Sequence, residues 1–223
     1  MREEALRRQG YSGGMTSNGF MTRVIPMFSL GLLMTTVGSY FAWNLPFGFL
    51  IFAAIVELIL IFTSSKWAYS EAANANIGLF LLFTTLTGMT LVPILKWASY
   101  TGGPGIIIQA LGISALTFAA LAGYGATTKK DFSGIGGFLM IALIGIIIAS
   151  LVNIFIGGTM FSLIISIISV LVFSGFILYD MAVIRRNFSD RDYIVASIAL
   201  YLDFILLFQN ILQILGILRS DDR

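Results

Sequence analysis

The chain has neither cysteine nor histidine among its 223 residues. Without cysteine it cannot form a disulfide, a thiolate metal site or a thiol nucleophile. Without histidine it lacks a common zinc ligand, the usual general base and the side chain that titrates closest to neutral pH. Any proton chemistry must therefore use carboxylates with shifted titration, lysine or tyrosine.

Charged residues are also scarce, at 11% of the chain, while hydrophobic residues make up 58%. Soluble domains have about 25% and about 45–50% respectively. A soluble fold of this length could not hide so much apolar surface from water, so we expect the bilayer to be its solvent. The net charge of +2 comes from basic residues in short connecting segments, so it does not indicate a nucleic-acid partner.

Seven apolar stretches predict an all-α, polytopic bundle of seven transmembrane helices, because each is long enough to cross a hydrocarbon core of about 30 Å. They cover residues 24–43, 45–63, 73–95, 104–126, 133–156, 159–184 and 193–218. Turn-forming residues separate several of them: Asn44-Leu45-Pro46, Gly102-Gly103-Pro104 and Gly157-Gly158. Small residues such as Gly31, Gly38 and Gly134-x-Gly136-Gly137 suggest close helix packing.

Residues 1–22 are polar and lack the features of a cleavable signal, so we expect an N-terminal tail followed by one transmembrane domain, residues 23–223. Ten of the 13 Lys and Arg residues fall in segments on the N-terminal side of the membrane, which places the N-terminus in the cytoplasm. A last span that re-enters instead of crossing would raise this to twelve. The absence of retention or lipidation signals favours a bacterial or archaeal plasma membrane.

Three acids and no bases lie inside the seven spans: Glu57, Asp180 and Asp203. A carboxylate at mid-membrane costs several kcal/mol unless it is protonated, paired or hydrated. Asp180 lies about 8 Å inside the face that carries Arg185, and Asp203 about 15 Å along the following span. Because a short loop joins these two spans, a tilt or a broken helix end could bring the carboxyls together. The alternative is that each acid is only a hydrogen-bonded packing residue.

Two segments carry a resemblance to a known family: Phe176–Asp180 (FILYD) and Ser197–Phe208 (SIALYLDFILLF), with Leu215–Leu218 (LGIL) closing the chain. Together they resemble the transmembrane Bax inhibitor motif family, including its bacterial calcium-leak members. The resemblance extends to Glu57 and to Val152–Phe155 (VNIF). It implies six helices around a central seventh, and a dyad of Asp180 and Asp203 that senses pH and gates a calcium leak.

The same resemblance makes Glu57 and Asn153 possible ion-pathway residues or secondary ligands. Bacterial members carry a run of basic residues after the second span, one of which is implicated in closing the pore. Here the matching region reads Ser64-Ser65-Lys66-Trp67-Ala68, so Lys66 is the one candidate for such a latch.

Two neighbouring carboxyls affect each other's ionisation. At about 4 Å and an effective dielectric of about 20, two negative charges repel by about 4 kcal/mol, so the pair holds its last proton toward neutral pH. With one proton shared the carboxyls attract; with none they repel and suit a hard divalent cation. Taken with the resemblance, which implies a calcium leak, we expect calcium as the transported species, with Asp180 and Asp203 as its ligands and no organic cofactor.

Other functions remain open at this stage. A proton-coupled cation transporter or exchanger would use the same acids. An intramembrane aspartyl protease would need Gly-x-Gly-Asp around its second acid, whereas Asp203 lies in Tyr-Leu-Asp-Phe, so we do not expect an enzyme. A pure interaction protein is also compatible with the sequence, which gives no indication of a protein partner. The partners that we expect are the lipid bilayer, calcium ions and protons.

Overall fold

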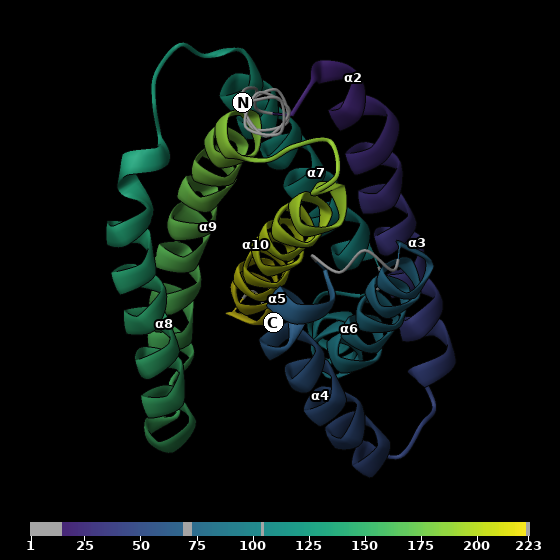
Figure 1. The fold of residues 1–223 in the computed structure, drawn as a ribbon. Helices are drawn as coiled ribbons and strands as arrows, with labels where there is room; N and C mark the ends of the chain where they lie inside the picture. The colour runs from purple at the N-terminus through teal and green to yellow at the C-terminus, as the bar shows by residue number, and fades with distance from the viewer. Residues whose placement is uncertain (1–14, 69–72, 104, 222–223) are drawn as a thin grey trace, which may run out of the picture. The chain divides into compact units, whose positions relative to one another are not determined.

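The computed structural model describes residues 15–68, 73–103 and 105–221, and these ranges contain helices and no strand. This confirms the all-α prediction (Figure 1). The helices run as follows: α2 Ser17–Gly19, a π-helical turn Phe20–Val24, α3 Ile25–Ala42, α4 Phe47–Phe62, α5 Ser64–Trp67, α6 Ala73–Gly102, α7 Gly105–Thr127, a 3-10 turn Ser133–Ile135, α8 Gly136–Ile156, α9 Thr159–Asn187 and α10 Tyr193–Asp221.

Six of the described helical stretches are long and apolar enough to cross a membrane, so the chain is a polytopic membrane protein. Helix α4 is apolar but has 16 residues, about 24 Å at 1.5 Å per residue, which is short for a span. Seven crossings therefore stay a prediction. The most buried apolar segment lies in α10, at 67%, and the least buried in α8, at 6%.

The predicted breaks fall between helices. Asn44-Leu45-Pro46 separates α3 from α4, and α8 ends at Ile156 before Gly157, which has a φ of +59°. Gly103 follows α6 with a φ of +76°, a conformation that favours glycine. Pro104, the third residue of that predicted break, lies outside the described residues.

The first helical stretch begins earlier than the apolar pattern predicts. The Thr16 hydroxyl accepts a hydrogen bond from the Gly19 N–H at 2.9 Å, which caps α2. The last residues of the predicted tail, from Ser17 onward, are therefore helical. The rest of the predicted tail, residues 1–14, lies outside the described residues, and the division into tail and membrane domain stays a prediction.

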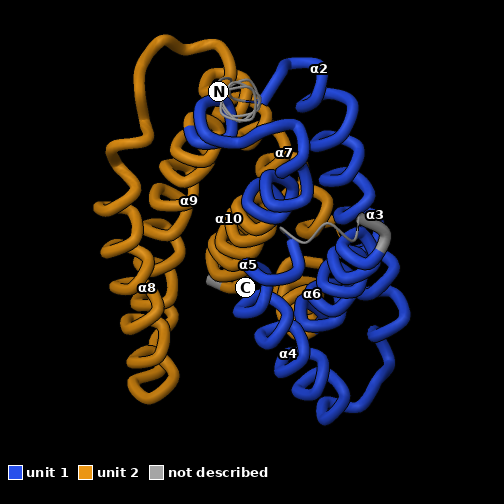
Figure 2. Tube along the Cα trace, viewed as in Figure 1, with its two compact units in different colours: residues 1–92, 183–201 blue, residues 93–182, 202–223 orange. Residues whose placement is uncertain are grey.

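The chain divides into two compact units, which Figure 2 shows in two colours. Unit 1 comprises residues 1–92 and 183–201, and unit 2 comprises residues 93–182 and 202–223. The unit boundaries pass through α6, α9 and α10, so each unit contains parts of these three helices.

Glycines allow helices to approach closely within each unit. In unit 1, a Cβ on Gly38 would meet the backbone carbonyl of Thr85, and a Cβ on Gly88 that of Thr35, so α3 and α6 touch through their backbones. In unit 2, a Cβ on Gly136 would meet the ring of Tyr179. Close packing was thus correctly predicted at Gly38 and Gly136, and also at Gly31, which faces Phe80. It was wrong at Gly134 and Gly137, which have open space around them.

Candidate functional site

The carboxyls of Asp180 and Asp203 meet in unit 2, where α9 and α10 bring them into a side-chain hydrogen bond. We call these two residues the aspartate dyad. Both helices run without a break through their aspartate, so the broken helix end considered from the sequence is absent here. A hydrogen bond between two carboxyls needs a proton on one of them, because an ionised carboxylate can only accept.

Helix length explains how the two depths match. Helix α9 continues to Asn187, which puts Asp180 about 10 Å from that helix end, while Asp203 lies about 15 Å from the start of α10 at Tyr193. The remaining difference is smaller than one helical turn of about 5.4 Å. Two aspartate side chains on neighbouring helices can bridge such an offset.

The dyad is largely shielded from solvent. Asp203 is 5% exposed, and its Oδ2 atom has no hydrogen-bond partner within the part of the chain that the structure describes. Asp180 is half-buried. An orphaned buried carboxyl oxygen is costly in a protein interior, and it marks a place where a proton or a cation would gain free energy on binding.

The residues next to the two aspartates pack against neighbouring helices. Tyr179, before Asp180, lies against the surface of α8 at Gly136, and Met181, after it, lies against α7 at Gly125. Phe204, after Asp203, makes an edge-to-face contact with Phe118 of α7 at a centroid distance of 5.6 Å. The dyad is therefore set between apolar contacts on both of its helices.

Glu57 occupies a different polar site, in unit 1. Its Oε1 accepts a hydrogen bond from the Thr87 hydroxyl at 2.7 Å, and its Oε2 accepts one from the Thr90 hydroxyl at 2.8 Å. Thr87 and Thr90 are three residues apart on α6, so both hydroxyls face the same side of that helix. Glu57 is thus hydrogen-bonded at both oxygens.

A second hydroxyl cluster lies in the same unit. The Tyr201 hydroxyl is 2.6 Å from the Thr35 hydroxyl, and Thr35 also donates to the carbonyl of Thr84 at 3.0 Å. The Tyr201 side chain is fully buried, with the rings of Phe80 and Phe83 edge-on to it. These contacts tie α3, α6 and α10 together within unit 1.

The two remaining candidates lie apart in the chain and differ in exposure. The Asn153 side chain donates to the Ser162 hydroxyl at 2.7 Å, while its Oδ1 atom is buried without a partner among the described residues. Lys66 is exposed on the short helix α5. Neither the pathway role of Asn153 nor the latch role of Lys66 is tested by these contacts.

Sequence reasoning missed the hydroxyl partners of Glu57 and the Thr35–Tyr201 pair. The one available signal was the Thr87-x-x-Thr90 spacing, which places two hydroxyls on one helix face. The spacing does not say which acid those hydroxyls meet, because that depends on how α4 and α6 are registered.

The helices and the intramembrane acids define an all-α polytopic membrane protein with carboxyl-based polar sites. A family model described as inhibitor of apoptosis-promoting Bax1 matches residues 17–220, and the chain belongs to this family. The match confirms the resemblance that the Phe176–Asp180 and Ser197–Phe208 segments carry.

Bacterial proteins share much of this sequence. A Vibrio cholerae protein named as an uncharacterized membrane protein is 44% identical over 155 residues, which cover 68% of this chain and 69% of that protein. A Helicobacter pylori protein is 35% identical over 91% of this chain and 88% of its own length. A Borreliella burgdorferi protein is 36% identical over 93% and 95% respectively. The similarity to these two proteins thus extends over nearly the whole length of each chain.

Proposed function

We propose that this protein is a pH-sensitive calcium leak channel of a bacterial plasma membrane, with its N-terminus in the cytoplasm. The observation that carries the proposal is the aspartate dyad: two carboxyls in direct contact on helices that belong to a membrane protein. The family membership and the bacterial relatives support it. The excess of Lys and Arg on one set of connecting segments supports the orientation.

The dyad would couple protonation to the packing of α9 against α10. With one proton shared, the hydrogen bond holds the two helices together at Asp180 and Asp203. When that proton leaves, two negative charges about 4 Å apart repel by about 4 kcal/mol at an effective dielectric of about 20. Repulsion of that size exceeds a typical side-chain contact, so the two protonation states favour different separations of the helices and hence different leak rates.

Calcium suits this site because it is a hard cation that prefers oxygen ligands. Two aspartates supply at most four of the six to eight oxygens that calcium takes, so a calcium ion here would keep part of its water. The described residues contain no group of three or more acidic side chains that could hold a metal ion. Such an incomplete shell favours passage over permanent binding, with Glu57 and Asn153 as further oxygens along the path.

The test is calcium flux into proteoliposomes that contain a calcium-sensitive dye, measured between about pH 5 and about pH 8, a range chosen to bracket the dyad's last proton. Asp180→Asn and Asp203→Asn each remove one titrating carboxyl, so we expect the flux of either variant to lose its dependence on pH. Asp131→Asn is the matched control, because Asp131 lies between α7 and α8, outside the predicted spans. A pH profile that stays unchanged in both dyad variants would refute the proposal.

Glu57 and Lys66 separate ion passage from gating. Glu57→Gln keeps an oxygen but removes the charge, and we expect a lower calcium flux with the midpoint of its pH profile unchanged. Lys66→Gln removes the proposed latch, and we expect a higher flux under the conditions in which the wild-type channel is closed. An unchanged flux in both variants would limit the proposal to the dyad.

Proton exchange is the second candidate, because a hydrogen-bonded dyad would share a proton that could be exchanged for a cation. An exchanger moves protons and calcium in a fixed ratio, whereas a leak needs no counter-ion. A pH-sensitive dye inside the same liposomes decides between them. Calcium entry without stoichiometric proton exit supports the leak.

A further inference from the structure

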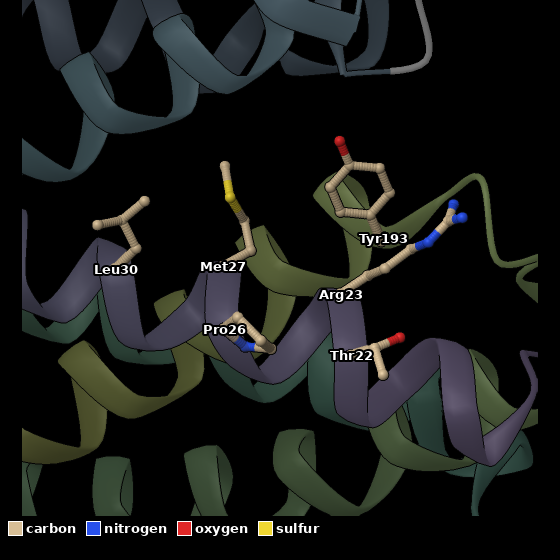
Figure 3. Close-up of a pocket in the computed structure, with 6 residues that line it drawn as sticks. All are labelled: Thr22, Arg23, Pro26, Met27, Leu30 and Tyr193. Carbon is tan, nitrogen blue, oxygen red and sulfur yellow. The ribbon is translucent and has the colours of Figure 1, made fainter.

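A groove on unit 1 is lined by a basic residue, hydroxyl groups and apolar side chains, whereas the dyad consists of two acids. It has a volume of about 320 Å³, near the lower end of the roughly 300–1,000 Å³ found for small-molecule sites. Its lining consists of Thr22, Arg23, Pro26, Met27, Leu30 and Tyr193 (Figure 3). The groove therefore combines one positive charge and two hydroxyls with a row of apolar side chains.

The local sequence explains the shape of this region. Residues Phe20–Val24 form a π-helical turn, in which the Ile25 N–H reaches back to the Phe20 carbonyl. Pro26 follows, and proline has no N–H with which to continue the regular helical pattern. Single π-helical turns inside α-helices are frequently found at functional sites. Thr22 and Arg23 belong to this turn and line the groove.

Arg23 is held in place at one end of the groove. Its Nη1 donates to the Asp190 main-chain carbonyl at 3.2 Å, and its guanidinium lies 5.9 Å from the centre of the Tyr193 ring. The side chain is exposed. A guanidinium has five N–H donors, so further donors remain for a ligand oxygen, and their planar arrangement matches two oxygens of a phosphate.

The Asp190 carboxylate lies near Arg23 and would oppose an incoming anion. It accepts hydrogen bonds from the Thr16 N–H and the Thr16 hydroxyl, both at 2.8 Å. Arg23 donates to the main-chain carbonyl of Asp190, and its positive charge also has a small attractive effect on the Asp190 carboxylate. A phosphate at Arg23 therefore has a positive partner.

The rest of the groove suits a hydrocarbon chain. Pro26, Met27 and Leu30 continue from Arg23 along α3, and the seven steps from Arg23 to Leu30 give a rise of about 10 Å. Arg23 lies near the start of the first apolar helical stretch and Tyr193 begins α10, so both are near helix ends, where Arg and Tyr anchor membrane proteins at the headgroup level. We infer that this groove binds an anionic phospholipid, with the phosphate on Arg23 and an acyl chain along Pro26, Met27 and Leu30.

The test uses the full-length protein in neutral detergent with an equimolar mixture of phosphatidylglycerol and phosphatidylcholine. Native mass spectrometry counts the lipids of each kind that stay bound. One basic residue near a membrane surface contributes about 1 kcal/mol toward anionic lipid, so Arg23→Gln should weaken the preference for phosphatidylglycerol roughly fivefold. Arg23→Lys keeps the charge and should retain most of the preference. Arg191→Gln is the matched control, because it removes one exposed charge from the same loop as Asp190 without lining the groove.

Two further measurements guard against a folding defect in the Arg23→Gln variant. Leu30→Asp leaves Arg23 intact but places a negative charge at the apolar end, and it should also reduce phosphatidylglycerol binding. A phosphatidylglycerol analogue with a photoreactive acyl chain should label the peptide that contains Met27 and Leu30. Equal retention of both lipids by the wild type, an equal loss in Arg23→Gln and Arg191→Gln, or labelling confined to other helices would each overturn the inference.

Discussion

Gly88→Ala tests the close approach of α3 and α6 in unit 1. A Cβ at Gly88 would overlap the carbonyl oxygen of Thr35 and lie 2.8 Å from its carbonyl carbon and 2.9 Å from its Cα. Real Cβ atoms essentially never come closer than 3.0 Å to such neighbours. The atoms in the way are backbone, which cannot rotate aside like the end of a long side chain. Helix α3 or α6 must therefore move.

The cost can be built from three contributions. Overpacking that forces backbone shifts costs about 1–3 kcal/mol. Replacing a helical glycine by alanine returns up to about 1 kcal/mol through helix propensity. Movement at Thr35 also strains its hydrogen bond to Tyr201, a contact of 2.6 Å that is worth about 1 kcal/mol. We expect a net destabilisation of about 1–3 kcal/mol, and a melting temperature lower by roughly 2–4 °C for each kcal/mol.

The assay is thermal unfolding of the purified protein in detergent, compared at a fixed heating rate. Gly78→Ala is the matched control, since Gly78 lies on the same helix with open space around it and should gain the propensity without a clash. Equal melting temperatures for Gly88→Ala and Gly78→Ala would show that α3 and α6 do not approach each other as described.

Two other changes in unit 1 test its polar contacts. Tyr201→Phe removes a buried hydroxyl but leaves Thr35 its carbonyl acceptors, so we expect a loss of about 1 kcal/mol, measured by denaturant unfolding in detergent. Asp190→Ala removes the acceptor of both Thr16 hydrogen bonds and should cost less than about 1 kcal/mol near neutral pH, because both bonds are exposed to solvent. Those bonds, with a smaller effect of Arg23, lower the pKa of Asp190, so their stabilisation is fully present above the ordinary value of 3.8 and is lost as pH falls through the lowered pKa. A difference between Asp190→Ala and the wild type that already disappears near pH 6 would contradict this assignment.

The sequence predicted the helices well because apolar length and turn residues are local signals. Every predicted span corresponds to a helix, and glycine or proline lies at the breaks that were predicted. The pairing of Asp180 with Asp203 could also be predicted from the sequence, because a short loop makes α9 and α10 antiparallel neighbours. The difference in depth between Asp180 and Asp203 could not be predicted from the sequence. Helix α9 ends at Asn187, in a polar segment where hydropathy does not show where a helix ends.

Contacts between distant segments could not be predicted. Helix α2 begins at Ser17 beside Asp190, and the hydrogen bond from Thr16 to Asp190 joins residues 174 positions apart. The partners of Glu57 on α6 depend on how two helices slide past each other, which a shift of one turn would change. Neither contact leaves a pattern in hydropathy, so a single sequence does not contain a local signal for it.

The two carboxyl sites differ in what surrounds them, and the difference bears on function. Glu57 receives two hydroxyl donors, which can stabilise an ionised carboxylate without any proton being shared. Asp203 is paired with another acid, Asp180, and their hydrogen bond needs a proton on one of the two carboxyls. Under the proposed function, a change of pH breaks the contact at the dyad and leaves the donors around Glu57 in place. It follows that the Asn variants of the dyad should change the pH response of the flux, whereas Glu57→Gln should change its size. An identical effect of all three variants in one flux assay would mean that the two sites are not distinct.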